Sequence, residues 1–127
     1  MTTREYIKKY HLQEANFNLN FDKFLKDFIA EFNERIDRTI AERKKADLDF
    51  GFNIFQNLIK EMQTKFNSIS AHTLGCLPIS IWNGFYAKGV IPARAKYFPV
   101  EHAEINARRE LLKKQDEIIK KAAAKKA

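Results

Sequence analysis

Glycine and proline are scarce in this 127-residue sequence, which contains four glycines and three prolines. Both residues mark tight turns, so their scarcity disfavours a turn-rich β-protein and favours long helices. Cysteine occurs once, at Cys76, which excludes an intramolecular disulfide and a metal cluster held by several cysteines. This cysteine usage fits a reducing compartment, and we expect a cytoplasmic protein.

Long apolar runs are missing as well. No run approaches the ~18 consecutive apolar residues that a membrane-spanning helix needs. The first ten residues, MTTREYIKKY, lack the apolar core of a secretory signal. We therefore expect neither a membrane partner nor export.

Signals for catalysis and cofactor binding are also weak. The three histidines lie far apart, without carboxylates at the spacing of a zinc site, and no glycine-rich phosphate loop is present. His72 and Cys76 are four residues apart, a spacing that would suit a nucleophile and its base on one helix. Because a glycine and Pro78 disfavour a continuous helix there, we expect a structural cysteine. The sequence thus predicts no cofactor, no metal and no enzymatic activity.

What the sequence does contain is phenylalanine, with eleven residues, placed mostly at helical spacing. Asn20 is a suitable N-cap for a helix that runs to about Lys45. A second helix runs to about Ala71, and a short polar connector between two long helices favours antiparallel packing. Apolar residues three and four apart form one stripe on each helix and predict the core: Phe21, Phe24, Leu25, Phe28, Phe32, Ile36 and Ile40, then Phe55, Leu58, Ile59, Met62, Phe66 and Ile69.

A third helix is expected from Pro78 onward, and it carries most of the remaining aromatic residues. Pro92 lacks an N–H group and its ring clashes with the carbonyl four residues earlier, so we expect a kink or break around residues 89–91. Rings mixed with bases allow two interpretations, a core segment or a stacking surface for nucleic acid. Trp82 and Phe85 are expected in the core, and Gly89 and Ala93 are small enough to let another helix approach. The candidate stacking residues are Tyr86, Tyr97 and Phe98, with Lys88, Arg94 and Lys96 projecting from the flanks.

The last segment, from Val100 onward, strongly favours a helix, and its final residues, 121–127, are expected to fray. Ile105, Leu112 and Ile119 recur every seven residues and predict a narrow seam that packs on the body or on a second copy, as a homo-oligomer. Leu111 and Ile118 share the same spacing.

Charge is distributed unevenly along the chain. Residues 1–58 contain ten Lys/Arg and ten Asp/Glu, whereas residues 59–127 contain thirteen and six, which is the whole net charge of +7. A basic half attracts polyanions or acidic protein surfaces. The candidate contacts are Lys88, Arg94, Lys96, Arg108, Arg109, Lys113, Lys114, Lys120 and Lys121, with Lys125 and Lys126 beyond them.

Residues 65–99 include the run LGCLPISIWNGFYAKGVIPARAKYFP, in which Trp is followed by Phe-Tyr-Ala, then a base and an aromatic-Pro ending. This stretch resembles small uncharacterised proteins of bacteriophages and mobile elements. The resemblance implies no activity and no functional residues. It implies a host-cell cytoplasmic setting in which small non-enzymatic proteins bind host machinery or nucleic acid.

Together these observations predict a single all-α domain over residues 1–127. Its expected bundle has two long antiparallel helices, a proline-broken aromatic helix and a basic C-terminal helix. The leading hypothesis is a non-enzymatic protein that binds DNA or RNA without sequence specificity. The alternative is a phage-encoded interaction module that docks on an acidic partner surface, as an inhibitor of a host or defence protein or as a virion assembly component.

Overall fold

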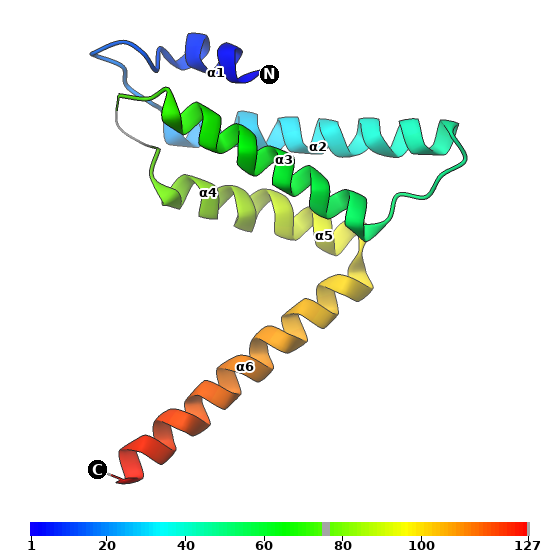
Figure 1. Cartoon of the computed structure of the whole chain (residues 1–127), viewed down its shortest axis with the longest axis vertical. Helices are drawn as coiled ribbons and strands as arrows, with labels where there is room; N and C mark the ends of the chain where they lie inside the picture. The colour runs from blue at the N-terminus through cyan, green and yellow to red at the C-terminus, as the bar shows by residue number, and fades with distance from the viewer. Residues whose placement is uncertain (75–76, 127) are drawn as a thin grey trace. The chain divides into compact units, whose positions relative to one another are not determined.

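The computed structural model describes residues 1–74 and 77–126, with side chains described up to Ala123. These residues form helices and no strand, which confirms the all-α class (Figure 1). The chain divides into two compact units, Met1–Pro92 and Ala93–Ala127. In chain order the elements are α1 (Thr3–Tyr10), α2 (Phe21–Lys45), α3 (Phe52–Ala71), α4 (Ile79–Phe85), the π-helical turn η1 (Tyr86–Val90), α5 (Ile91–Tyr97) and α6 (Pro99–Lys126).

The two long helices of the first unit bury most of the stripes expected of them, with Phe21 as an exposed exception. Asn20 caps α2, where its side-chain oxygen accepts a hydrogen bond from the backbone N–H of Lys23 at 3.0 Å, as predicted. α2 and α3 contact each other and run in opposite directions (Figure 1). Their apolar stripes form the core, with Phe24, Phe28, Phe32, Ile36, Phe55, Leu58, Met62, Phe66 and Ile69 all buried.

The rings of α4 complete this core. Phe85 is fully buried, and its ring centroid lies 4.8 Å from that of Phe28. The half-buried Trp82 ring lies 5.6 Å from Phe66 and 5.2 Å from Phe85. The core interpretation is therefore confirmed for Phe85, whereas Trp82 contacts the core rings but stays half-buried.

The α-helix is interrupted before Pro92, where a kink or break was expected, but by a change of helix type and not by a loop: α4 ends at Phe85, the π-helical turn η1 follows, and α5 begins at Ile91. In this wider turn the N–H of Ile91 donates to the carbonyl of Tyr86, five residues earlier. A π-helical turn inserted into an α-helix changes the hydrogen-bond ladder locally. This widening lets the helix continue past a proline whose ring would clash with an α-helical carbonyl.

Gly89, in the widened turn, allows a close approach to α2. A Cβ atom added at Gly89 would lie 3.2 Å from Cγ1 of Ile29 and 3.3 Å from the Phe85 ring. Glycine is unfavourable inside a helix, so its place here reflects the contact with the neighbouring helix, as the sequence indicated.

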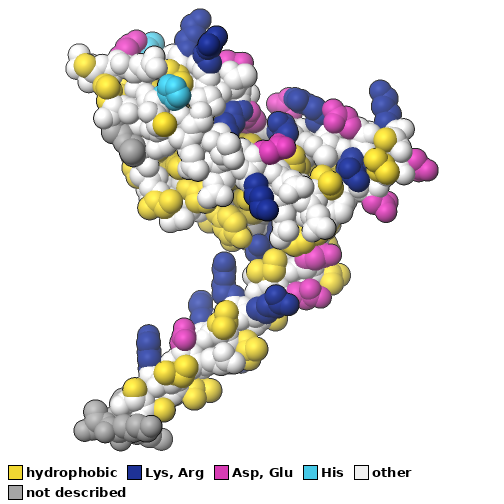
Figure 2. All heavy atoms as spheres, in the orientation of Figure 1, with side chains coloured by type: hydrophobic (Ala, Val, Ile, Leu, Met, Phe, Trp, Pro, Cys, Tyr) yellow, Lys and Arg dark blue, Asp and Glu magenta, His cyan; other side chains and the backbone are white. Residues whose placement is uncertain are grey.

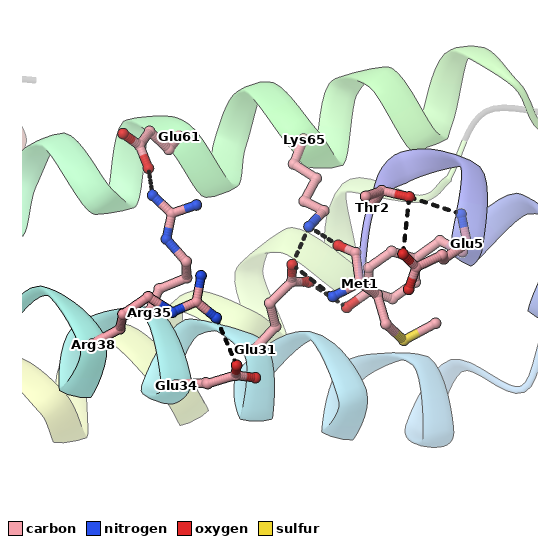
Figure 3. Close-up of polar contacts among 10 residues, drawn as sticks. Met1, Thr2, Glu5, Glu31, Glu34, Arg35, Arg38, Glu61 and Lys65 are labelled. Carbon is pink, nitrogen blue, oxygen red and sulfur yellow. Dashed lines mark hydrogen bonds and ion pairs between the residues drawn. The ribbon is translucent and has the colours of Figure 1, made fainter.

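Two carboxylates of α2 hold α1. The Tyr6 hydroxyl donates to Glu31 at 2.8 Å, and the Tyr10 hydroxyl donates to Asp27 at 2.6 Å. Glu31 also accepts from Lys65 of α3 and from the Met1 ammonium (Figure 3). This carboxylate therefore links three helices, α1, α2 and α3.

The ionisation of these groups depends on that network. Burial alone would raise the pKa of Glu31, but hydrogen bonds from Lys65, Tyr6 and the Met1 ammonium outweigh it and lower the pKa below its ordinary value. Burial raises the pKa of Tyr6, and the hydrogen bond to Glu31 raises it further. Glu31 is therefore held ionised and the Tyr6 hydroxyl is held protonated.

Glu31 should make the fold sensitive to acid. Its folded-state pKa is lowered, so its contribution is complete above the ordinary value of 4.5 and is lost as pH falls through the folded-state pKa. We expect Glu31→Gln to reduce the free energy of unfolding by about 1–3 kcal/mol at neutral pH. The variant should also lose less stability than the parent in acid. Denaturant unfolding followed by circular dichroism, from neutral pH to about pH 3, measures both effects.

The matched control is Glu34→Gln, on the same helix. Glu34 accepts from Arg38 at 2.7 Å, one turn away, and both side chains are exposed (Figure 3). An exposed pair of this kind contributes little, so the control should stay within about 0.5 kcal/mol of the parent. Equal stability of the two variants would contradict the role assigned to Glu31.

Candidate nucleic-acid interface

The second unit consists mainly of α6, whose composition favours a helix. Leucine, alanine, lysine, arginine and glutamate dominate Pro99–Lys126, and Glu101 lies in the first turn, where a negative charge is favourable. Every side chain described from Asn106 to Ala123 is exposed. The backbone is helical as far as Lys126, including most of the tail that was expected to fray. α6 therefore presents both its charged and its apolar side chains to solvent.

Three bases share one side of α6. Arg109, Lys113 and Lys120 follow one another by four and seven residues, which places them within about 40° around the helix and over about 16 Å of its length. All three are exposed, and we call them the basic face, although the exposed Asp116 lies on the same side between Lys113 and Lys120. Lys114 and Lys121 are exposed on the next side of the helix.

The charges of the basic face are not cancelled by contacts. No ion pair joins a base of α6 to a carboxylate among its described side chains. Residues 93–127 contain ten Lys/Arg and five Asp/Glu, a net charge of +5. Figure 2 shows dark-blue side chains along one edge of this helix and yellow ones along the other, with a few magenta ones among them. The excess positive charge is therefore available to a ligand.

The seam predicted from the sequence is mostly exposed. Leu111, Leu112, Ile118 and Ile119 are between 57% and 66% exposed, and Ile105 is half-buried. We call these five residues the apolar face. Arg108, a candidate contact, lies within the apolar face by its helical position and not on the basic face. Gln115 lies there as well.

Arg94 does not project into solvent, so that part of the sequence interpretation is wrong. The residue is 4% exposed, and its Nε donates to Nδ1 of His102 at 3.2 Å. His102, in the first turns of α6, lies eight residues after Arg94 and beyond a proline. Side chains that contact each other along one helix are three or four residues apart, so this spacing does not predict a contact. Nothing in the local pattern could have indicated this contact.

Lys88 and Lys96 are exposed, as predicted. Lys88 belongs to the π-helical turn of the first unit. Lys96 lies in the second unit, where its Nζ is 5.0 Å from the centroid of the Tyr97 ring. An ammonium over an aromatic face is a favourable contact.

Of the three candidate stacking residues, Phe98 does not fit the predicted role, because it is only 9% exposed. Its backbone links α5 to α6: the N–H of Phe98 donates to the carbonyl of Arg94 at 2.8 Å, and the carbonyl of Phe98 accepts from the N–H of His102 at 2.9 Å. A base can stack only on an exposed ring. Tyr86 and Tyr97 are half-buried, and their role in stacking stays a prediction.

Other chemistry finds little support among the described residues. No group of three His, Cys, Asp or Glu side chains there could hold a metal ion. No helix in that part of the chain has the length and apolar character required to cross a bilayer. His72, at the end of α3, donates from Nδ1 to the carbonyl of Ser68 at 2.7 Å. Its suggested partner Cys76 lies outside the described residues, as do the side chains of Lys125 and Lys126.

No protein-family model matches this chain, no curated protein matches its sequence, and no solved structure matches its fold. The resemblance of residues 65–99 to bacteriophage proteins stays a prediction. A function must therefore be argued from the side chains themselves.

Proposed function

We propose that the protein is a non-enzymatic binding protein that engages nucleic acid through the basic face of α6. One observation carries the proposal: Arg109, Lys113 and Lys120 are exposed, share one side of a helix and form no ion pair with the described carboxylates of that helix. Ammonium and guanidinium groups that are already paired with a carboxylate must give up that partner before they bind phosphate. The charged groups of Arg109, Lys113 and Lys120 have no such ion pair to break with the described carboxylates of α6.

The binding mode follows from this arrangement. A row of bases about 16 Å long can lie along several successive phosphates of either DNA or RNA. Each phosphate neutralised by a base releases a condensed counterion, which drives binding without reading the sequence. Contacts to phosphates carry no sequence information, so a face that binds through phosphates should have an affinity independent of sequence.

A salt titration tests this mode. For a contact through three bases, the logarithm of the association constant should fall with the logarithm of the salt concentration with a slope of about −2.7 on duplex DNA. Fluorescence anisotropy with labelled duplexes of equal length and unrelated sequence measures the slope and the sequence dependence together. A salt-independent affinity, or a strong preference for one duplex, would contradict the proposed mode.

The second candidate is an interaction module that docks on an acidic protein surface, such as a phage-encoded inhibitor or assembly component. The apolar face of α6 favours it, because four large apolar side chains exposed on one helix suit a protein interface. The second candidate predicts that the nuclease-treated protein shows no affinity for the labelled duplexes in the same titration. It also predicts that an acidic protein stays bound to the nuclease-treated protein in stoichiometric amount.

A further inference from the structure

The apolar face of α6 is the most prominent feature that the proposed function leaves unused. The sequence repeats the pattern apolar-apolar-Lys-Lys, with Leu111-Leu112 and then Ile118-Ile119 each followed by two lysines. The four apolar side chains are more than half exposed. A seven-residue repeat of this kind keeps its apolar side chains on one side of the helix and is typical of helix pairing.

We propose that the occupant of this face is α6 of a second copy, packed antiparallel, with the two-fold axis between Leu111 and Leu112. In that register Leu111 of each copy lies opposite Leu112 of the other, and Ile105 lies opposite Ile118. The interface is self-complementary, because the same surface serves on both copies.

The direction follows from charge. Arg108 and Gln115 occupy the middle of the apolar face. Parallel pairing in register would set Arg108 against Arg108 of the second copy, and like charges at a helix seam are unfavourable. Antiparallel pairing sets each Arg108 against Gln115, whose side-chain oxygen can accept its hydrogen bonds.

The available area suits a reversible dimer. Five partly or mostly exposed apolar side chains from each copy would bury roughly 1,000 Å² in total, near the lower end of the range for specific interfaces. We therefore expect a monomer–dimer equilibrium at micromolar concentrations. The basic face lies on the other side of the helix, so pairing leaves Lys113 and Lys120 of both copies accessible, and the proposal does not depend on nucleic-acid binding.

Cysteine cross-linking of the full chain tests the arrangement. In a Cys76→Ser background, Arg108→Cys and Gln115→Cys are prepared as separate proteins, so that each carries a single thiol. Antiparallel pairing predicts a disulfide-linked heterodimer, identified by mass spectrometry, when the two proteins are mixed under mild oxidation, and little dimer when either protein is oxidised alone. Parallel pairing predicts a disulfide-linked homodimer of each protein and little heterodimer, and that result would overturn the proposal.

Light scattering and sedimentation give the second arm. We expect twice the mass of the single chain at high concentration and at least tenfold weaker association for the Leu111→Gln, Leu112→Gln double variant. The matched control, Lys113→Gln with Lys114→Gln, changes adjacent residues on the charged sides and should associate as the parent does. A parent chain that stays monomeric at several hundred micromolar, or a double variant that still dimerises, would overturn the proposal whatever the nucleic-acid affinity.

Discussion

Replacing Phe28 with alanine is expected to reduce the free energy of unfolding by about 3–5 kcal/mol, because it removes a ring from the centre of the core. Phe28 is fully buried, and its ring centroid lies 4.8 Å from that of Phe85, 5.7 Å from that of Phe24 and 6.2 Å from that of Phe66. The ring also contacts Tyr6 of α1. One substitution would thus loosen the contacts of four elements at once.

The same helix offers a matched control. Phe21 lies seven residues earlier, at the first position of α2, and is 49% exposed. Phe21→Ala should cost under about 1 kcal/mol, since much of its ring is in water in both states. Urea unfolding followed by far-ultraviolet circular dichroism gives both values. The loss expected at Phe28 is a large part of a typical domain's stability of about 5–15 kcal/mol, so Phe28→Leu provides a milder variant that should still fold. Similar losses of unfolding free energy at positions 21 and 28 would contradict the core assignment.

The difference between Phe21 and Phe28 also shows how far periodicity alone can be taken. Both residues belong to one apolar stripe in the sequence, and the pattern of α2 and α3 predicts which side of each helix is buried. It cannot say where along a helix burial ends. That limit is set by which neighbouring elements are present, and at the start of α2 the neighbours leave half of the Phe21 ring exposed.

The sequence indicated that the α-helix is interrupted before Pro92 but not that a π-helical turn does this, for a related reason. A proline inside a helix is unfavourable by its local geometry, and local geometry is what a sequence pattern reports. The widened turn that accommodates it contains Gly89, which lies against Ile29, sixty residues earlier in the chain. Contacts between distant residues can stabilise a turn that local preferences disfavour, and sequence periodicity does not record them.

The residues of the candidate interface also fall into those that a local pattern predicts and those that depend on distant contacts. The exposed bases of α6 could be predicted, because charged residues spaced along a helix are exposed unless another element covers them. The roles of Arg94 and Phe98 could not be, since both lie where α5 meets α6 and depend on how the chain turns at Pro99. Their burial removes one base and one ring from the predicted surface. What remains of the prediction in the second unit is centred on α6.

Reversing the charges of the basic face should therefore have the largest effect on binding. We expect the Arg109→Glu, Lys113→Glu, Lys120→Glu triple variant to bind nucleic acid at least about 100-fold more weakly, and its salt slope to fall in magnitude by about 2.7, which is about 0.9 for each contact. All three side chains are exposed, so the helix content should not change. Fluorescence anisotropy gives the affinity and the slope, and circular dichroism checks the fold.

The control must show whether the affinity for nucleic acid depends on the position of the charges or only on the net charge of the protein. Lys26, Lys44 and Lys60 lie on α2 and α3, are exposed, and form no ion pair among the described residues. Changing all three to glutamate lowers the net charge by the same six units as the triple variant of α6. If the basic face makes the contacts, this control loses only the long-range part of the attraction, which salt screens within about 10 Å at 0.1 M ionic strength. Equal losses from the two variants would mean that affinity follows net charge alone, and α6 would then have no special part in binding.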